Sequence, residues 1–458
     1  MSKNGHRKPP GPRGLPLLGV ALEVRRDALR SLQRYARDYG DVVVLPVLNH
    51  RRIFVNRPDL IQQMLLFQQN KLHKSDLTKE VVGPLLGHGL LISEGDFWRR
   101  QRRLAQPAFH KQRVNEYSST MVECAETQTR GWQEGQRRDV AEEMMALTLE
   151  SAVRTLFGTT LPGEAEGVGR AMTFLMRYSL ARARAPIRIP ASWPTKTNLR
   201  SRREFKYMDS LIYRIIGERQ AQAKGSDGDV YGNSSECSDL LSMLMGAMDE
   251  DGSCMTPQQL RDETMTLFIA GHETTALTLA WTWYALSQNP AAETRLHREL
   301  DSVLGGRKPE ATDLERLPYL SAVVSEVLRL YPAAYIMART TIDEVRLDVY
   351  EFSPGTTILF SQWVMHRDPR YYEAPEEFRP ERWLEGLAAR LPAGAYFPFG
   401  DGPRRCIGQG FALLETSLVV ATIAQRFRFR LIANQKVAPE PLVTLRPHNG
   451  IQMTVHAR

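Results

Sequence analysis

The sequence predicts a mainly α-helical fold with a minor β part. From residue 58 to residue 299 the apolar residues recur almost throughout with helical spacing. Runs typical of strands are few and short, and they fall at residues 41–45, 52–55, 345–347 and 356–361. One helical pattern, of roughly 33 residues, is longer than most helices of globular proteins. Together these observations indicate a helical fold that contains only small sheets.

The composition is that of a globular protein. The 458 residues are 42% hydrophobic and 24% charged, values that exclude a disordered, collagen-like or disulfide-scaffold chain. The net charge of +8 favours an acidic partner or surface without identifying one. The motifs described below belong together, so we expect a single domain over residues 1–458 that begins with a Pro/Gly-rich arm at residues 1–19.

Cysteine usage and hydropathy indicate the cellular setting. The four cysteines, Cys124, Cys237, Cys254 and Cys406, have no spacing of a zinc site or a redox pair. Prolines and glycines interrupt the N-terminus before any signal-peptide core, and no apolar run of about 18 residues occurs elsewhere. We therefore expect a reduced, cytoplasmic protein without a membrane anchor.

The N-terminal part is predicted to be an extended arm followed by a helix and two paired strands. Residues 8–19 are rich in proline and glycine, which suits an arm laid over a surface. A helical pattern covers residues 28–39, and the strand-like runs at 41–45 and 52–55 follow it. Breaks in the later helical region are predicted at residues 83–95, 186–194 and 224–238.

The long helix has clear start and stop signals. Thr256 suits the N-cap, Pro257 the first helical position, and Gln259 completes a capping box. The pattern ends at Asn289, because Pro290 cannot continue it. A helix of this length spans about 50 Å, the full width of a domain.

The middle of this helix carries polar residues in an apolar setting. Residues 267–276 read Leu-Phe-Ile-Ala-Gly-His-Glu-Thr-Thr-Ala. One interpretation is a buried helix whose threonines hydrogen-bond to its own carbonyls. The other interpretation is a functional role. Gly271 weakens a helix by roughly 1 kcal/mol, and an acidic residue beside it in an apolar helix also favours such a role. The residues alone leave both interpretations open.

A second signal surrounds Cys406. The segment from Phe397 to Ala412 is rich in glycine and runs into a helical pattern at residues 411–427. A cysteine near a helix N-terminus is stabilised as a thiolate and can then bind a metal, although a lone cysteine is more often inert packing. Five residues define the spacing of the segment as Phe-x-x-Gly-x-Arg-x-Cys-x-Gly: Phe399, Gly402, Arg404, Cys406 and Gly408.

With these residues, the chain resembles the cytochrome P450 family, of the soluble bacterial type, along nearly its whole length. The resemblance implies the P450 fold, in which a long central helix lies over a haem and a loop supplies the cysteine ligand. It makes Cys406 the iron ligand and haem b, iron protoporphyrin IX, the cofactor, with Phe399 and Gly408 in the binding loop. Two further motifs, at residues 326–329 and 380–383, match the family and imply a buried triad of Glu326, Arg329 and Arg382.

The long helix matches the family's oxygen-activation segment. By this resemblance Ala270 and Gly271 lie at the oxygen site, where Gly271 gives room for dioxygen, and Glu273 and Thr274 deliver protons. The chemistry is consistent with this, because heterolytic cleavage of the O–O bond needs two protons that an acid and a hydroxyl can relay.

Haem carboxylates need cations and hydrogen-bond donors. The resemblance assigns this role to five residues: Trp98, Arg102, Arg339, His366 and Arg404. Trp98 and Arg102, four residues apart, would share one helical face. Each assignment has a plainer alternative, because the arginine run at residues 99–103 could be a solvated basic face and His366 a loop histidine.

Function follows from these expectations. We expect a monooxygenase that hydroxylates or epoxidises a lipophilic compound such as a fatty acid or terpenoid, in an apolar pocket. The predicted lining includes residues 172–176 and, singly, Leu91, Phe268, Ala334 and Ile336. A haem-thiolate isomerase or dehydratase, and a non-catalytic haem sensor or electron carrier, are the alternatives.

Electrons should come from a separate protein, since no flavin or iron–sulfur segment follows residue 458. We expect a small acidic ferredoxin or flavodoxin, served by an NAD(P)H-dependent reductase, to be steered to Arg99, Arg103 and Arg405. We expect the protein to be a monomer and to bind no nucleic acid.

Overall fold

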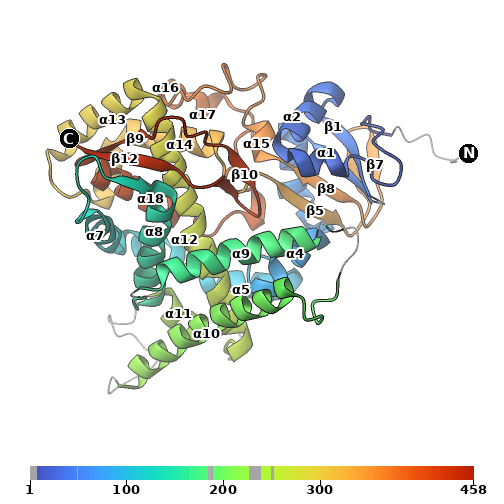
Figure 1. Cartoon of the computed structure of the whole chain (residues 1–458). Helices are drawn as coiled ribbons and strands as arrows, with labels where there is room; N and C mark the ends of the chain where they lie inside the picture. Colours follow the sequence, from blue (N-terminus) through green and yellow to red (C-terminus); the bar gives the residue numbers. More distant parts are fainter. Residues whose placement is uncertain are drawn as a thin grey trace, which may run out of the picture. The chain divides into compact units, whose positions relative to one another are not determined.

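The computed structural model describes residues 8–458 except 49, 162, 184, 186–188, 226–238 and 249–251. The chain forms two compact units (Figure 1). Unit 1 runs up to Thr78 and resumes from Ser325 to Cys406, whereas unit 2 comprises Lys79–Val324 and Ile407–Arg458. Within the described residues no helix combines the length and the apolar character needed to cross a membrane.

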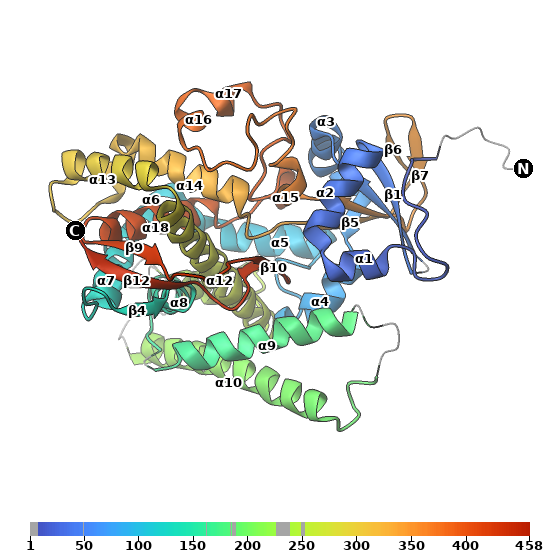
Figure 2. The same ribbon diagram turned by 45° about the horizontal axis from the view of Figure 1, so that its top comes forward.

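Unit 1 is built around a five-stranded mixed sheet with the order β1-β2-β8-β5-β3. Strands β2 and β8 are parallel, and the other neighbouring pairs are antiparallel. Helix α2 lies against β1 and α1 lies against α2 (Figure 2). The elements of unit 1 are α1 (Ala21–Arg26), α2 (Ala28–Tyr39), β1 (Val42–Val47), β2 (His50–Val55), α3 (Pro58–Gln62), β3 (Leu72–Lys74), β5 (Met337–Thr341), β6 (Val345–Leu347), β7 (Tyr350–Phe352), β8 (Thr357–Phe360), α15 (Gln362–Met365), α16 (Glu381–Leu384) and α17 (Leu387–Arg390), with short turns η1 (Gln63–Phe67), η2 (Gln69–Lys71) and η5 (Gly402–Arg404).

Unit 2 is a helical body in which α8 packs along α12, and α9 and α10 run side by side (Figures 1 and 2). A three-stranded sheet, β4-β12-β9, and the hairpin β10-β11 complete it. The elements of unit 2 are α5 (Gly95–Ala105), α6 (Lys111–Glu116), α7 (Ser118–Thr129), β4 (Arg137–Asp139), α8 (Val140–Phe157), α9 (Ala165–Ala183), α10 (Lys196–Gly225), α11 (Leu240–Gly246), α12 (Pro257–Gln288), α13 (Pro290–Leu304), α18 (Gln409–Ala424), β9 (Phe427–Leu431), β10 (Pro439–Pro441), β11 (Leu445–Pro447) and β12 (Gln452–Ala457), with short turns η3 (Gln106–Phe109) and η4 (Ala311–Arg316). Helices α4 (Asp76–Leu86) and α14 (Pro318–Leu330) span the unit boundary along the chain.

The prediction of a mainly α fold with small sheets is confirmed. Helix α2 coincides with the predicted residues 28–39, and α12 has the expected caps. The Thr256 hydroxyl accepts from the Gln259 amide at 3.2 Å, and the Gln259 side chain accepts from the Thr256 amide at 2.9 Å. With Pro257 at its first turn, α12 extends over 32 residues.

Two predicted boundaries are wrong. The break at residues 83–95 starts too early, because α4 continues through Gly83 and Pro84 to Leu86. The helix expected at residues 411–427 begins at Gln409 and ends at Ala424, because Phe427 already belongs to β9. The predicted break at 186–194 is confirmed for residues 189–194, which are not helical and lie between α9 and α10, whereas residues 186–188 are outside the described residues. The predicted break at 224–238 lies outside the described residues except for 224 and 225, which end α10.

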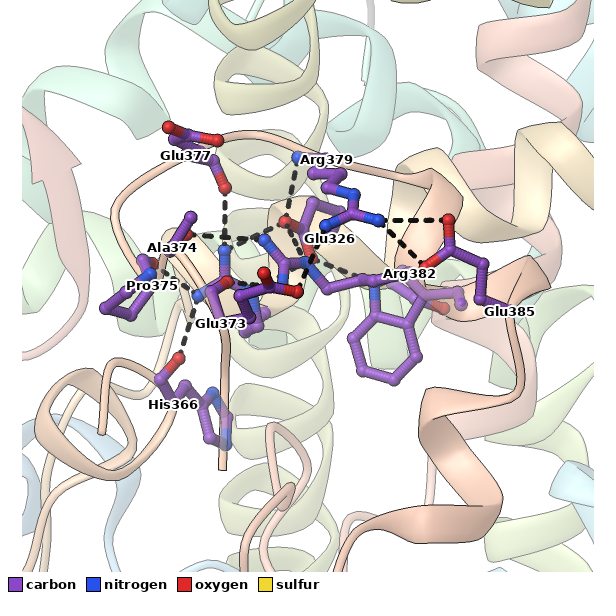
Figure 3. A network of polar contacts seen from close by, with 12 residues as sticks. Glu326, His366, Glu373, Ala374, Pro375, Glu377, Arg379, Arg382 and Glu385 are labelled. Atoms are coloured by element: carbon purple, nitrogen blue, oxygen red, sulfur yellow. Dashed lines mark hydrogen bonds and ion pairs between the residues drawn. The ribbon is translucent and has the colours of Figure 1, made fainter. Parts of the chain in front are cut away.

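The core of unit 1 contains a charged network centred on Glu326 (Figure 3). Both oxygens of this fully buried carboxylate accept hydrogen bonds from the Arg329 guanidinium at 2.8 Å, and one also accepts from Arg382 Nε at 3.0 Å. Two more donors complete the set, the Trp383 indole N–H at 2.9 Å and the Arg379 amide at 2.9 Å. The structure thus brings together the three residues expected as a triad and adds Trp383.

The arginines of this network also hold the neighbouring loop. Arg329 Nη1 donates to the carbonyl oxygens of His366 and Pro375, at 2.9 and 2.6 Å, and Nη2 donates to that of Glu377 at 2.9 Å. Arg382 donates to the carbonyl oxygen of Glu373 at 2.8 Å. Since every N–H of Arg329 is used, the guanidinium fixes three carbonyl groups of an irregular stretch of backbone.

Substitution of the central carboxylate should therefore destabilise the protein strongly. Glu326→Gln keeps the shape but leaves Arg329 and Arg382 without a buried countercharge, which should cost about 3–5 kcal/mol of unfolding free energy. Trp383→Phe is the matched control, because it removes one hydrogen bond and no charge and should cost about 1–3 kcal/mol. Urea unfolding of the holoenzyme measures both. Equal losses in the two variants would contradict the central role of the charge.

Candidate active site

Cys406 ends a loop of unit 1 that turns on two glycines. Gly400 and Gly402 have positive φ angles of 71° and 67°, which side chains other than glycine adopt at a cost. A Cβ on Gly402 would lie 2.1 Å from the carbonyl oxygen of Leu65, so glycine is also required by the close approach of η1. The Cys406 amide donates to the Phe399 carbonyl at 2.9 Å, and the Cys406 residue is exposed. The loop therefore presents an accessible thiol.

Helix α12 presents an accessible stripe within a largely buried surface. Ala270 is exposed and Ile269, Gly271 and Thr274 are half-buried, whereas His272, Glu273 and residues 260–268 are buried. Ala270 and Thr274 lie four residues apart and hence on one face of the helix. This stripe of small side chains is the part of α12 that a bound group can approach.

The structure gives Gly271 a packing role. A Cβ at this position would lie 3.2 Å from Leu156 Cδ1 and 4.0 Å from Ala152 Cβ, both on α8. The glycine thus lets α8 approach α12 closely, and its missing side chain is directed to α8. Room for dioxygen at Gly271 stays a prediction, to which this contact adds no support.

Thr274 and Glu273 are adjacent in sequence, but the structure does not bring their side chains together. The Thr274 hydroxyl donates to the Ala270 carbonyl at 2.9 Å, which is the bond within the helix that the structural interpretation predicts. Its oxygen still has capacity to accept a hydrogen bond. Glu273 is 1% exposed and binds the C-terminal hairpin instead, through the Thr444 hydroxyl at 2.6 Å and the Arg446 guanidinium at 2.8 Å.

His272 and Phe268 lie on the core side of α12. The His272 ring is fully buried, its Nδ1 donates to the Phe268 carbonyl at 2.7 Å, and burial lowers the pKa of the imidazole. Phe268 has no exposed surface and its ring lies 6.2 Å from that of Phe157. The prediction that Phe268 lines a substrate pocket is therefore not supported, because its helical phase directs it into the core of unit 2 and away from Ala270.

Trp98 and Arg102 share one face of α5, as predicted. The Arg102 guanidinium carbon lies 5.9 Å from the centre of the Trp98 ring, Trp98 is buried and Arg102 is half-buried. In unit 1, Arg339 is buried on β5 and Arg404 is half-buried in η5. Each unit thus offers arginines of the expected type, and their contact with haem carboxylates stays a prediction.

His366 has a different environment from the one expected. Its ring is fully buried, Nε2 accepts from the Phe397 amide at 3.0 Å, and burial together with Arg329 and Arg367 lowers its pKa to about 3. The ring is therefore neutral near pH 7 and its bonded nitrogen faces the backbone. A neutral imidazole offers no positive charge, but Nδ1, which has no hydrogen-bond partner among the described residues, can still donate one hydrogen bond. A contact of His366 with a haem carboxylate therefore stays a prediction.

The loop that carries Leu91 is fixed to α12 by two carboxylates. Asp262 accepts from the His88 amide at 2.8 Å, and Glu263 accepts from the Leu90 amide at 3.0 Å. Burial raises the pKa of Glu263 to about 7. Leu91 itself is 41% exposed, so it is available to a ligand. The other two predicted lining residues, Ala334 and Ile336 in unit 1, are exposed and half-buried.

Sequence analysis missed Glu415, a fully buried acid on α18. Its carboxyl group faces the hydroxyls of Ser151 on α8 and Thr275 on α12, which lower its pKa slightly, but burial dominates and raises the pKa to about 8. Neither oxygen has a well-formed hydrogen bond among the described residues. Glu415 is therefore protonated near pH 7 and links three helices of unit 2 as a neutral group.

This assignment predicts how stability depends on pH. Between about pH 4.5 and pH 8 the folded state keeps a proton on Glu415 that the unfolded state has lost, so stability falls as pH rises, by up to about 1.4 kcal/mol per pH unit. Glu415→Gln should flatten this dependence. Its free energy of unfolding, compared with that of the wild type at the same pH, should therefore be larger at pH 8 than at pH 5. Urea unfolding at four pH values measures it.

Glu415→Leu serves as the control, because it also removes the titrating group but loses the polar contacts at every pH. A slope in Glu415→Gln equal to that of the wild type would show that another group is responsible.

The residues present fit a haem with a single protein ligand. Thiolate sulfur is an established axial ligand of haem iron, and Cys406 offers an accessible thiol on a rigid loop. In unit 2, Ala270 and Thr274 leave part of one face of α12 exposed, and Trp98 and Arg102 carry donors of the kind that haem carboxylates require. In unit 1, Arg339 carries further donors of this kind.

Comparison with known proteins agrees with this chemistry. The profile of the family described as "Cytochrome P450" matches residues 9–455. The chain is 38% identical to cyclooctatin synthase of Streptomyces melanosporofaciens, over 95% of this chain and 92% of that protein. It is 34% identical to cyclooctat-9-en-7-ol 5-monooxygenase of the same organism, over 92% and 89%. Identity to pentalenene oxygenase of Streptomyces avermitilis is 29%, over 98% and 97%.

The chain belongs to the cytochrome P450 family. It is a monooxygenase, an oxidoreductase that uses a haem cofactor and works on lipophilic substrates with a redox partner.

Proposed function

We propose that this monooxygenase inserts one oxygen atom from dioxygen into a terpenoid-like substrate, by hydroxylation or epoxidation. Two of the relatives are named for oxygenation of cyclooctat-9-en-7-ol and of pentalenene, both terpenoids. The side chains expected to meet the substrate, Leu91, Ala334 and Ile336, are apolar and have exposed surface. Such a lining suits a hydrocarbon skeleton with few polar groups.

The accessible stripe of α12 is the observation that carries the proposal. It is the one place where this buried helix offers both open space, at Ala270, and a hydroxyl, at Thr274. An isomerase or a haem sensor has no use for a proton donor there, whereas oxygen insertion needs one. Glu273, one residue away, supplies the acid, although its side chain must leave the hairpin or act through water to reach Thr274.

We assign haem b as the cofactor, held by Cys406, with Phe399 and Gly408 in the ligand loop. When bound, haem supplies the redox chemistry that activates dioxygen. Trp98, Arg102, Arg339 and Arg404 would hold its carboxylates. Thr274 and Glu273 would relay protons from solvent, and the apolar residues around them would exclude bulk water from the substrate.

We further propose an acidic ferredoxin or flavodoxin as the electron donor. Arg99, Arg103 and Arg405 are exposed. Arg99 is in part neutralised by Asp96, three residues before it on α5. Electrostatic steering of this kind weakens as salt shortens the Debye length.

A ligand screen tests the proposed substrate class. Cyclic terpene alcohols and hydrocarbons should shift the haem spin state and should yield hydroxylated or epoxidised products with a surrogate ferredoxin and reductase, and fatty acids should do so more weakly. Cys406→Ser is the control, because it should abolish the thiolate signature of the reduced carbon monoxide complex and all turnover. Tight binding of fatty acids with no response to terpenoids would overturn the assignment.

Thr274→Ala should separate proton delivery from binding. The variant should keep its affinity for haem and substrate, since Thr274 contributes little buried surface. The rate of proton delivery should fall by as much as about 10²-fold, because water can replace the hydroxyl only in part. More hydrogen peroxide and less product per NADPH are expected. Thr274→Ser retains the hydroxyl and should recover the coupling. Unchanged coupling in Thr274→Ala would assign Thr274 to helix packing alone.

A further inference from the structure

The hairpin β10-β11 contacts two helices of unit 2 that matter for function, α9 and α12. Toward α12, the Leu445 carbonyl accepts from the Trp281 indole N–H at 3.0 Å, and Thr444 and Arg446 both bind Glu273. Toward α9, Glu440 forms an ion pair with Arg177 at 2.8 Å. The hairpin is therefore a physical connection between the acid of α12 and the surface of α9.

The contacts of Glu273 are distributed unequally between its two oxygens. Oε1 accepts from Thr444 Oγ1 at 2.6 Å, from Arg446 Nε at 3.0 Å and from Arg446 Nη2 at 2.8 Å. Oε2 is buried and has no hydrogen-bond partner among the described residues. A buried carboxylate oxygen without a donor is costly, so Oε2 is the atom that would gain most from a water or a proton.

Arg446 uses the rest of its guanidinium to hold α9. Nη1 donates to Thr173 Oγ1 at 2.6 Å, and Nη2 lies 3.6 Å from Met176 Sδ. The side chain is almost entirely buried, and Thr173 is oriented by its own bond to the Gly169 carbonyl at 2.8 Å. Because the guanidinium is a rigid planar fork, a shift of α9 that displaces Thr173 must also displace the nitrogens bound to Glu273.

We propose that Arg446 is a positioning residue for the proton-delivering acid, and that it makes the position of α9 a determinant of how Glu273 is aimed. This inference rests on the proposed role of Glu273. Of residues 172–176, the expected substrate lining on α9, Thr173 and Phe174 are half-buried and the other three belong to the core. A substrate that presses on this face of α9 therefore acts through Thr173 on the same guanidinium that holds the acid. Arg446 thereby relates substrate shape to the efficiency of proton delivery.

Charge balance supports the assignment. The Arg446 and Glu273 side chains form a buried ion pair, and the Glu440 carboxylate opposite Arg446 in the hairpin register is directed to Arg177 instead. Removal of the Arg446 charge would leave Glu273 buried with the Thr444 hydroxyl. Lysine at position 446 would keep the charge but could not bind Oε1 and Thr173 in the same planar geometry.

The experiment compares Arg446→Lys and Arg446→Gln with Arg177→Ala in the holoenzyme. Arg177→Ala is the matched control, because it breaks the other link between hairpin and α9 without touching Glu273. Three quantities are measured: product formed per NADPH, the solvent deuterium isotope effect on turnover, and hydrogen–deuterium exchange of the α9 amides at residues 169–177.

We expect both Arg446 variants to lower product per NADPH on the order of 10-fold and to raise the solvent isotope effect, since a misaimed acid makes proton transfer slower. Arg446→Lys, which keeps the charge, should fold and bind haem even where Arg446→Gln does not. Exchange in α9 should rise in both Arg446 variants. Arg177→Ala breaks only a partly exposed ion pair, so it should keep the α9 exchange, the coupling and the isotope effect of the wild type.

Two outcomes would overturn the inference. If Arg177→Ala lowered the coupling as much as Arg446→Lys without a rise in α9 exchange, loss of any positive charge near the hairpin would be the cause, and not the link from Arg446 to Glu273. If Arg446→Lys kept wild-type coupling while Glu273→Gln lost it, Glu273 would deliver protons without help from Arg446. Glu273→Gln also separates this inference from the proposed function: unchanged coupling in that variant would reject the role of the acid itself.

Discussion

A carboxylate in a protein interior must be paired, hydrogen-bonded or protonated, and both units of this protein are organised around that requirement. Glu326 meets it with two arginines, an indole and a backbone amide, and the same arginines fix the loop between residues 366 and 382. Glu273 meets it on one oxygen only, through Arg446 and Thr444. Glu415 meets it by keeping its proton. Both oxygens of Glu326 are held by donors, whereas Glu273 Oε2 has no hydrogen-bond partner among the described residues and can accept one.

Features that depend on residues close together in the chain could be predicted from the sequence. The caps and prolines of α12 act within four residues of the helix ends, so its boundaries follow from the sequence. The ligand loop of Cys406 combines residues only a few positions apart, and its glycines occupy backbone conformations that glycine adopts readily. The pairing of Glu326 with Arg329, one helical turn apart, was accessible for the same reason.

Features that depend on tertiary packing could not be predicted from the sequence. Arg446 lies 173 residues after Glu273, and nothing in either segment indicates that they meet. The burial of Phe268 and His366 and the contact of Gly271 with α8 depend on which helical face each neighbour covers. Trp383 belongs to a motif that the sequence did show, but its bond to Glu326 became evident only from the fold. An apolar or aromatic residue has no sequence signal that distinguishes core from pocket.

The mixed sheet of unit 1 has a consequence for biosynthesis. Its parallel pair joins Arg52 on β2 to Thr357 on β8, so the inner edge of the N-terminal hairpin has no neighbour until about 300 further residues have been translated. At roughly 5–20 residues per second the ribosome needs about 15–60 s for that stretch. During this interval β2 exposes an unpaired strand edge, the feature that most readily captures other chains. Residues 50–55 therefore depend on β8, synthesised about 300 residues later, to cover this edge of the hairpin.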